Sequence, residues 1–294
     1  MTRGKHERKG VFMHIRIGYE LTYDCLQPVP MLLMLNVHPA RLSDLVVVDE
    51  MVIEPETAIE RYRDCFGNLC TRLVAAPGQI RLSADGIVRD GGEPDAVDND
   101  ARQHAIEDLP NAAMVFLLAS RYCDIDRLSD TAWSLFGKTA PGWSRVQAIV
   151  DYVHNHLAFG YEHARSTRTA LDAYRERIGV CRDFAHLSIA FCRAMNIPAR
   201  YCTGYLGDIG VPPCDLPMDF SAWFEVYLSG RWYAFDARHN MPRIGRIPVA
   251  IGRDAADVAI STTFGPNTLT GFRVHTEEIV PAEVTPPVFA AHPP

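Results

Sequence analysis

The feature that most constrains the fold is a change from strand-like to helix-like patterning along the chain. From 14 to 90, runs such as HIRIGYELTYD alternate apolar and polar residues, and the pair Gly67-Asn68 separates two of them as in a hairpin. The acidic, glycine-containing stretch DGGEPDAVDND is typical of a linker, and helical spacing follows it. We therefore predict an α+β chain in three parts. The parts are a disordered lead-in over 1–12, a β-rich, sandwich-like domain over 13–95 and an α+β domain over 96–290.

Four helices are expected after the linker, in NAAMVFLLASRYC, in RLSDTAWSLFG, in SRVQAIVDYVHNHLAFG and after Val180. The third places its apolar residues on one stripe, with Ser144 as the expected N-cap. The fourth begins at Cys181 and ends before Pro198. The residues expected on the buried sides of these two helices are Val146, Ile149, Val150, Val153 and Leu157, then Phe184, Leu187, Phe191 and Met195.

Composition and charge exclude several classes of protein. With 48% hydrophobic and 22% charged residues among 294, the chain is typical of a globular protein. A net charge of −7 argues against non-specific nucleic-acid binding, and no apolar run is long enough for a membrane span. The basic first ten residues lead into no signal-peptide-like apolar segment, so the eight scattered cysteines are expected to be reduced and the protein cytoplasmic.

Cys181 is the first candidate catalytic residue. It lies in Gly-Val-Cys-Arg-Asp-Phe (179–184), at the first turn of a predicted helix. The backbone dipole at this position favours a thiolate over a thiol. A nucleophile of this kind also needs a base to manage its proton. A buried structural thiol is the alternative, since cysteine is among the most buried residue types.

A second hairpin is predicted where Ser229-Gly230 interrupts SAWFEVYLSGRWYAFDAR. A two-residue turn would pair Phe224 with Phe235 and sort the side chains onto two faces. One face is apolar and belongs in the core. The other is polar and aromatic, as the wall of a cleft would be, and carries Ser221, Trp223, Glu225, Tyr227, Trp232, Asp236 and Arg238. In this register Ser221 lies opposite Arg238, with Asp236 as its diagonal neighbour.

The segments GVCRDFAHLSIAFCRAMNIPARYCTGYL and DFSAWFEVYLSGRWYAFDARHN resemble the catalytic core of the bacterial transglutaminase-like superfamily. The resemblance is strong over about 140–245 and looser in the N-terminal part. It implies a papain-like α+β core preceded by a β-rich domain, with Cys181 as the nucleophile and Asp236 as the acid that orients a histidine. In that family the histidine usually stands in His-Ala-Trp, whereas this chain has Ser221-Ala222-Trp223.

The serine removes the expected base, because its hydroxyl cannot take up a thiol proton at neutral pH. Loss of a general acid/base costs about 10²–10⁴ in rate. His239 would point to the opposite face if the strand continued through it, and a bend after Ala237 would free it to act. His186 is expected to pack or cap. We expect His154, His156 and His163 to be solvated imidazoles at a helix end, and a metal site is the alternative.

Three functions remain open. The first is a cysteine protease or amidase that acts on amide, peptide or isopeptide bonds of a peptide or protein, with Cys181, Asp236 and Ser221 as its site residues. The second is a degenerate protein of the same fold that binds a peptide or ligand without turnover. The third is ester or thioester exchange, in which the leaving group needs less protonation. No metal, organic cofactor, nucleic acid or membrane is implied, and the sequence does not separate hydrolysis from acyl transfer.

Overall fold

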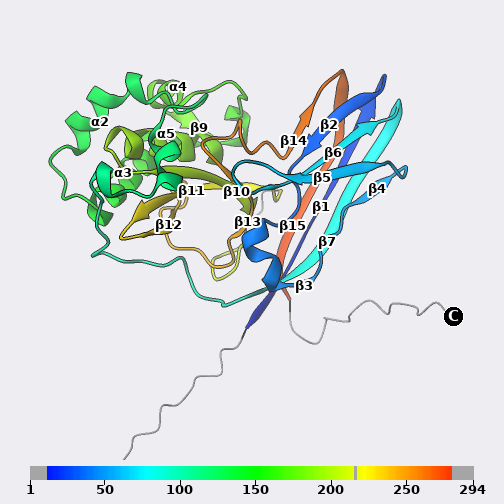
Figure 1. Ribbon diagram of the computed structural model, residues 1–294, viewed down its shortest axis with the longest axis horizontal. Coiled ribbons are helices and arrows are strands. Elements are labelled where there is room, and N and C mark those ends of the chain that lie inside the picture. The colour runs from blue at the N-terminus through cyan, green and yellow to red at the C-terminus, as the bar shows by residue number, and fades with distance from the viewer. Residues whose placement is uncertain (1–11, 215–216, 280–294) are drawn as a thin grey trace, which may run out of the picture.

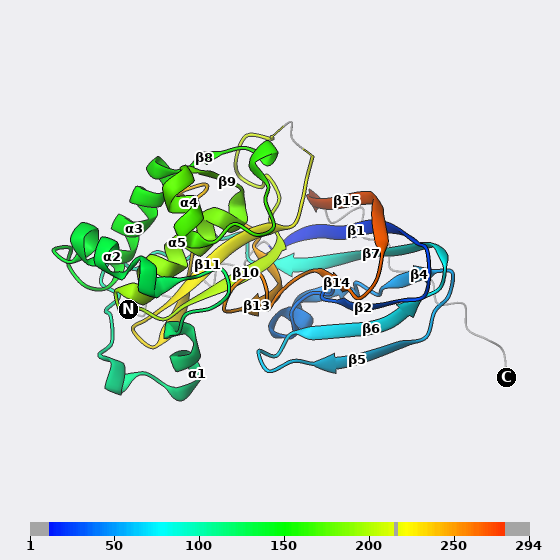
Figure 2. The same cartoon turned by 90° about the horizontal axis from the view of Figure 1, so that it is seen from above.

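The fold has a helical part and a strand-rich part that lie side by side (Figures 1 and 2). The structure is a computed structural model that describes residues 12–214 and 217–279. The predicted lead-in over 1–12 lies outside the described residues except at Phe12. Among the described helices, none combines the length and the apolar character needed to cross a membrane.

Two antiparallel sheets make up the strand-rich part, one in the order β15-β1-β7-β3 with β4 also paired to β7, the other in the order β14-β2-β6-β5. The alternation of apolar and polar residues in HIRIGYELTYD reflects the two faces of β1, because Ile15, Ile17 and Leu21 are fully buried on one of them. The strands are β1 (Met13–Cys25), β2 (Val29–Leu33), β3 (Leu45–Val47), β4 (Val52–Glu54), β5 (Ile59–Arg63), β6 (Leu69–Ala75), β7 (Gly78–Asp90), β14 (Ser261–Thr263) and β15 (Asn267–Ile279).

The last two strands return to the beginning of the chain. β15 pairs with β1 along its length, with Ile17 opposite Thr276, and β14 pairs with β2. The predicted α+β range of 96–290 therefore includes two strands that hydrogen-bond to the N-terminal sheets. The sequence does not indicate this return, because pairing with a distant strand does not change the local pattern of apolar and polar residues.

The predicted hairpin at Gly67-Asn68 is confirmed between β5 and β6. Gly67 has φ of 87°, and the Asp64 carboxylate accepts hydrogen bonds from the amides of Phe66 and Asn68 at 2.9 Å. The Asn68 side chain also joins the two parts of the fold. Its amide exchanges two 2.8 Å hydrogen bonds with the backbone of Ile251 in the helical part.

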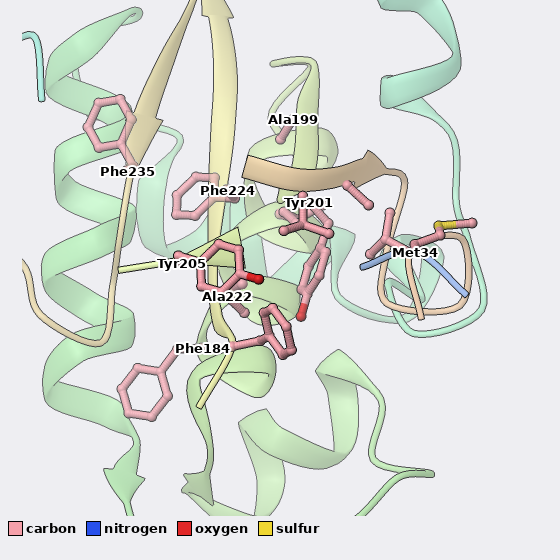
Figure 3. Close-up of a cluster of buried hydrophobic side chains, with 14 of the residues drawn as sticks. Met34, Phe184, Ala199, Tyr201, Tyr205, Ala222, Phe224 and Phe235 are labelled. Atoms are coloured by element: carbon pink, nitrogen blue, oxygen red, sulfur yellow. The ribbon is translucent and has the colours of Figure 1, made fainter. Parts of the chain in front are cut away.

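The helical part packs helices on a third antiparallel sheet, in the order β12-β11-β10-β13. Its core contains Phe184 from α5, Tyr201 and Tyr205 from β10, and Phe224 and Phe235 from β11 and β12 (Figure 3). The elements are α1 (Asn111–Met114), α2 (Ser129–Phe136), α3 (Trp143–His156), β8 (Ala158–Phe159), α4 (Ala170–Glu176), β9 (Ile178–Gly179), α5 (Cys181–Ala194), β10 (Ala199–Tyr205), β11 (Ser221–Leu228), β12 (Arg231–Phe235) and β13 (Ile247–Gly252).

The buried stripes predicted for α3 and α5 are confirmed in full, because all nine residues expected there are buried. The start of α3 is not as predicted: its N-cap is Gly142, with φ of 91°, and Ser144 lies inside the first turn. RLSDTAWSLFG forms α2 as expected. The segment NAAMVFLLASRYC forms only the one-turn α1 and a 3-10 turn over Val115–Leu117, so its expected helix is much shorter than predicted.

The register of the second hairpin is confirmed, with Leu228 opposite Arg231 and Phe224 opposite Phe235. The ladder ends at this last pair, so the chain turns at Asp236 before Arg238 can pair with Ser221. The second face is also less open than expected. Trp223 is 2% exposed, because it packs with its cross-strand neighbours Cys202 on β10 and Ile251 on β13, and the Arg246 guanidinium lies over its ring.

Candidate active site

The motif at the start of α5 is explained by a tight turn that presents Cys181. The Asp183 carboxylate reaches back and accepts a 2.9 Å hydrogen bond from the amide of Val180, the N-cap residue, which satisfies one of the free donors at the helix start. Gly179 is needed for this approach, because a Cβ there would lie 2.6 Å from the Cβ of Asp183. Glycine, cysteine and aspartate at this spacing therefore form one structural unit.

A buried ion pair fixes that unit. Arg168 Nη1 donates to Asp183 Oδ2 at 3.0 Å, and the two side chains are 4% and 0% exposed. The same guanidinium bridges to Glu176 on α4, with 3.0 Å between Nε and Oε2. Asp183 thus ties the first turn of α5 to α4 and to the loop before it.

Cys181 lines a pocket of about 420 Å³ on the surface of the helical part. Cys181 as a whole residue is half-buried, and the same pocket is lined by Ser221, Arg238 and His239. Ser221 comes from the start of β11, while Arg238 and His239 come from the turn after β12. The structure therefore brings the helix start and the two ends of the hairpin to one place.

Burial dominates the protonation of the thiol. It raises the pKa of Cys181 to about 11, although the Arg238 guanidinium and a hydrogen bond from the Ala222 amide act in the opposite direction. The net shift is therefore opposite to the one expected from the helix dipole alone, because burial outweighs the groups that favour the thiolate. At neutral pH the isolated group is a thiol, so any nucleophilic role requires a base.

Asp236 holds His239 in place. The Asp236 Oδ2 atom lies 2.8 Å from His239 Nδ1 and 3.1 Å from Arg246 Nη2, while its Oδ1 accepts from the amides of Arg238 at 3.0 Å and His239 at 3.2 Å. Burial alone would raise the pKa of Asp236, but Arg246 and His239 outweigh it and keep the pKa below its usual value. An ionised carboxylate beside Nδ1 orients the ring, so that Nε2 is the nitrogen left to exchange a proton.

The chain bends after Ala237, as required for His239 to act as a base. Residues 236–239 turn, and Asn240 follows with φ of 49°, a backbone conformation that asparagine tolerates. This turn places His239 on the same side as Asp236. The signal available in the sequence was His239-Asn240 directly after a strand end, because asparagine at a turn would have marked the end of the ladder.

The other histidines lie elsewhere. His186 is fully buried, stacks on Tyr122 and accepts a 3.1 Å hydrogen bond from the amide of Ala255, so the expectation that it packs is confirmed. His154 Nδ1 lies 2.9 Å from the carbonyl oxygen of Ala237, and His156 Nε2 lies 2.7 Å from that of Tyr174. We expected these imidazoles to be solvated, whereas in the structure both contact backbone carbonyl oxygens.

Comparison with known proteins agrees with this architecture. Residues 131–237 match the family model of the transglutaminase-like superfamily. The crystal structure of a "putative cysteine protease" from Cytophaga hutchinsonii is 33% identical, with a TM-score of 0.77 over 92% of this chain and 91% of that one. The chain belongs to the transglutaminase-like superfamily. The predicted papain-like α+β core with a β-rich companion is therefore the fold of a transglutaminase-like protein.

Two more relatives of this transglutaminase-like chain differ more in sequence. Uncharacterized protein ML0607 from Mycobacterium leprae (strain TN) is 24% identical over 228 residues, which cover 73% of this chain and 78% of the relative. The periplasmic domain of TgpA from Pseudomonas aeruginosa, in a structure bound to ethylmercury, is 14% identical with a TM-score of 0.38, over 78% of this chain and 90% of that one.

Proposed function

We propose that this transglutaminase-like protein is a cysteine hydrolase or acyl transferase that attacks amide or peptide bonds through Cys181. In this proposal His239 is the base and Asp236 is the acid that orients it. The observation that carries the proposal is the 2.8 Å contact between His239 Nδ1 and Asp236 Oδ2, with His239 and Cys181 lining one pocket. The base missing at Ser221 is thereby supplied from the turn that follows β12.

The chemistry follows from the positions of these groups. His239 Nε2 takes the thiol proton as Cys181 Sγ bonds to the substrate carbonyl carbon, and the imidazolium then returns the proton to the leaving amine. Asp236 stabilises the imidazolium through Nδ1. Water or a second amine then attacks the thioester and frees Cys181, which gives hydrolysis or transfer. The amides of Cys181 and Arg182 in the first turn of α5, which meet no acceptor in the described part of the chain, are suited to stabilise the developing oxyanion, whereas the Asp183 amide already donates to the Val180 carbonyl oxygen.

A binding protein without turnover is the second candidate. Two observations favour it: Ser221 stands where the family usually has histidine, and burial raises the pKa of Cys181 to about 11. Ester or thioester exchange is a weaker form of the same chemistry. It needs less help from an acid, because the leaving alcohol or thiol has a lower pKa than a leaving amine. Comparing turnover of matched ester and amide substrates separates it from amide hydrolysis.

Turnover of a panel of peptide amides and esters tests the proposal. We expect the native protein to be active and Cys181→Ala to fall to the uncatalysed background, because the covalent intermediate can no longer form. Cys65→Ala is the matched control, since Cys65 is an exposed thiol in the β5–β6 hairpin. Absence of native turnover across the panel, or equal turnover in the Cys181→Ala protein, would contradict the proposal and favour the binding protein.

A cytoplasmic location is part of the same proposal. All eight cysteines are free, and Cys65 and Cys214 are exposed, which suits a reducing compartment. Cell fractionation with an antibody to the chain tests this location.

A further inference from the structure

Arg238 is a cation beside Cys181 that has no carboxylate partner among the described residues. Its guanidinium lies 3.9 Å from the centre of the Phe159 ring and next to the Tyr161 hydroxyl. Both aromatic residues line the same pocket. Stacking on an aromatic face orients the planar guanidinium and leaves its N–H groups at the ring's edge for another acceptor.

Arg243 lines the pocket too and is only 4% exposed. Its Nη2 donates to the carbonyl oxygen of Gly207 at 2.9 Å and lies 3.5 Å from Asp208 Oδ1. Its Nε is buried and meets no acceptor within the part of the chain that the structure describes. A buried N–H of a charged group without an acceptor is costly, and a ligand oxygen would remove that cost.

The acids of the pocket compensate these charges only in part. Asp208 Oδ2 is engaged by the amide of Cys214 at 2.7 Å, and Asp219 Oδ1 by the amide of Phe220 at 2.6 Å. Burial raises the pKa of Asp219, which favours its neutral form. Both carboxylates of the pocket are thus partly engaged by backbone amides, and of the two only Asp208 lies within ion-pair distance of either arginine, at 3.5 Å from Arg243.

Repulsion among arginines points the same way. Arg246 is neutralised by Asp236 at 3.1 Å and by Asp95 at 2.7 Å, and no equivalent pair of carboxylates serves Arg238 or Arg243 in the described chain. Burial lowers the pKa of Arg243, and so do Arg246 and Arg238, while Asp208 and Asp236 offset part of this effect. An anion between Arg238 and Arg243 would relieve this repulsion.

We propose that Arg238 and Arg243 form a carboxylate-binding subsite, so that the substrate carries a carboxylate beside the amide that Cys181 attacks. That the ligand is a substrate rests on the proposed function. That the pocket binds a carboxylate rests on the arrangement of Arg238 and Arg243 alone. A guanidinium matches a carboxylate with two parallel N–H donors. The carboxylate could be the C-terminus of a peptide or the side chain of an acidic residue, and both have the same chemistry.

Binding to the full-length Cys181→Ala protein tests the subsite without any turnover. In one arm, isothermal titration compares N-acetyl-Ala-Ala with its C-terminal amide. In the other it compares N-acetyl-glutamate amide with N-acetyl-glutamine amide. We expect the acid to bind about tenfold or more tightly than its neutral partner in at least one arm, which also identifies the source of the carboxylate. Equal affinities in both arms would overturn the subsite.

Charge variants assign the effect to the pocket. Arg238→Gln is expected to remove most of the preference for the acid, and Arg243→Lys to weaken it, because lysine keeps the charge but loses the paired donors. Arg231→Gln is the matched control, since Arg231 is exposed at the hairpin turn and stacks on Tyr233. Circular dichroism checks the fold of each variant.

Full retention of the preference in both pocket variants would also overturn the subsite. Absence of turnover by the native protein, with the preference for the acid intact, would contradict the proposed function alone.

Discussion

Replacing His239 by glutamine is expected to lower kcat/KM for an amide substrate by about 10²–10⁴-fold at pH 7. Glutamine can still hydrogen-bond to Asp236 but cannot take up the thiol proton, and the pKa of about 11 that burial gives Cys181 leaves almost no thiolate on its own. Steady-state kinetics on the best substrate of the panel measures the effect, with circular dichroism as the check on folding.

Ser221→Ala is the control for this change, because Ser221 lines the same pocket and occupies the family's usual histidine position. We expect the serine variant to retain nearly native turnover. The double variant Ser221→His, His239→Gln returns the imidazole to the position usual in the family, and any recovery over His239→Gln would show that the loss was that of a base. Near-native activity of His239→Gln together with a large loss in Ser221→Ala would contradict the assignment.

Replacing Arg168 by methionine is expected to lower the free energy of unfolding by about 3–5 kcal/mol. The change removes the 3.0 Å partner of the fully buried Asp183 carboxylate, which keeps only the Val180 amide and the longer 3.3 Å contact to the more exposed Arg182 guanidinium. Urea denaturation followed by tryptophan fluorescence measures the change.

The matched control for that prediction is Arg165→Met. Arg165 pairs with Asp172 and Glu176 on the surface, with its side chain 43% exposed, so a loss of only about 0–1 kcal/mol is expected. Equal effects of the two substitutions would show that the Arg168–Asp183 pair does not fix the start of α5. Since that start presents Cys181, Arg168→Met is also expected to lower turnover.

Local patterns predicted the elements that are long and strongly periodic. The buried stripes of α3 and α5, the alternation of β1 and the register of the β11–β12 hairpin all follow from the spacing of apolar residues and from turn residues. The return of β14 and β15 to the N-terminal sheets did not, because pairing between strands so far apart leaves no mark on either segment.

The site shows the same division. Cys181 was placed at the start of a helix from the glycine before it and the apolar residues after it, as the structure has it. The alternating pattern predicts a strand that continues past Asp236, which would turn His239 away from the face that carries Ser221. The ladder stops at Phe235, three residues before the predicted Ser221–Arg238 pair, and residues 236–239 turn, so the alternation of a strand does not apply to His239. The place where the strand ends therefore decides that His239 lines the pocket of Cys181.

The rate at which iodoacetamide alkylates Cys181 tests most directly whether His239 activates this thiol. Mass mapping of the labelled peptides, from about pH 6 to pH 10, compares Cys181 with the exposed Cys65 and Cys214 in the native protein and in His239→Gln. We predict that native Cys181 reacts fastest at pH 7 and that the variant loses this advantage, with its rate rising only toward the pKa of about 11 set by burial. Native Cys181 reacting no faster than Cys65 and Cys214, or reacting equally in the variant, would contradict a thiol activated by His239.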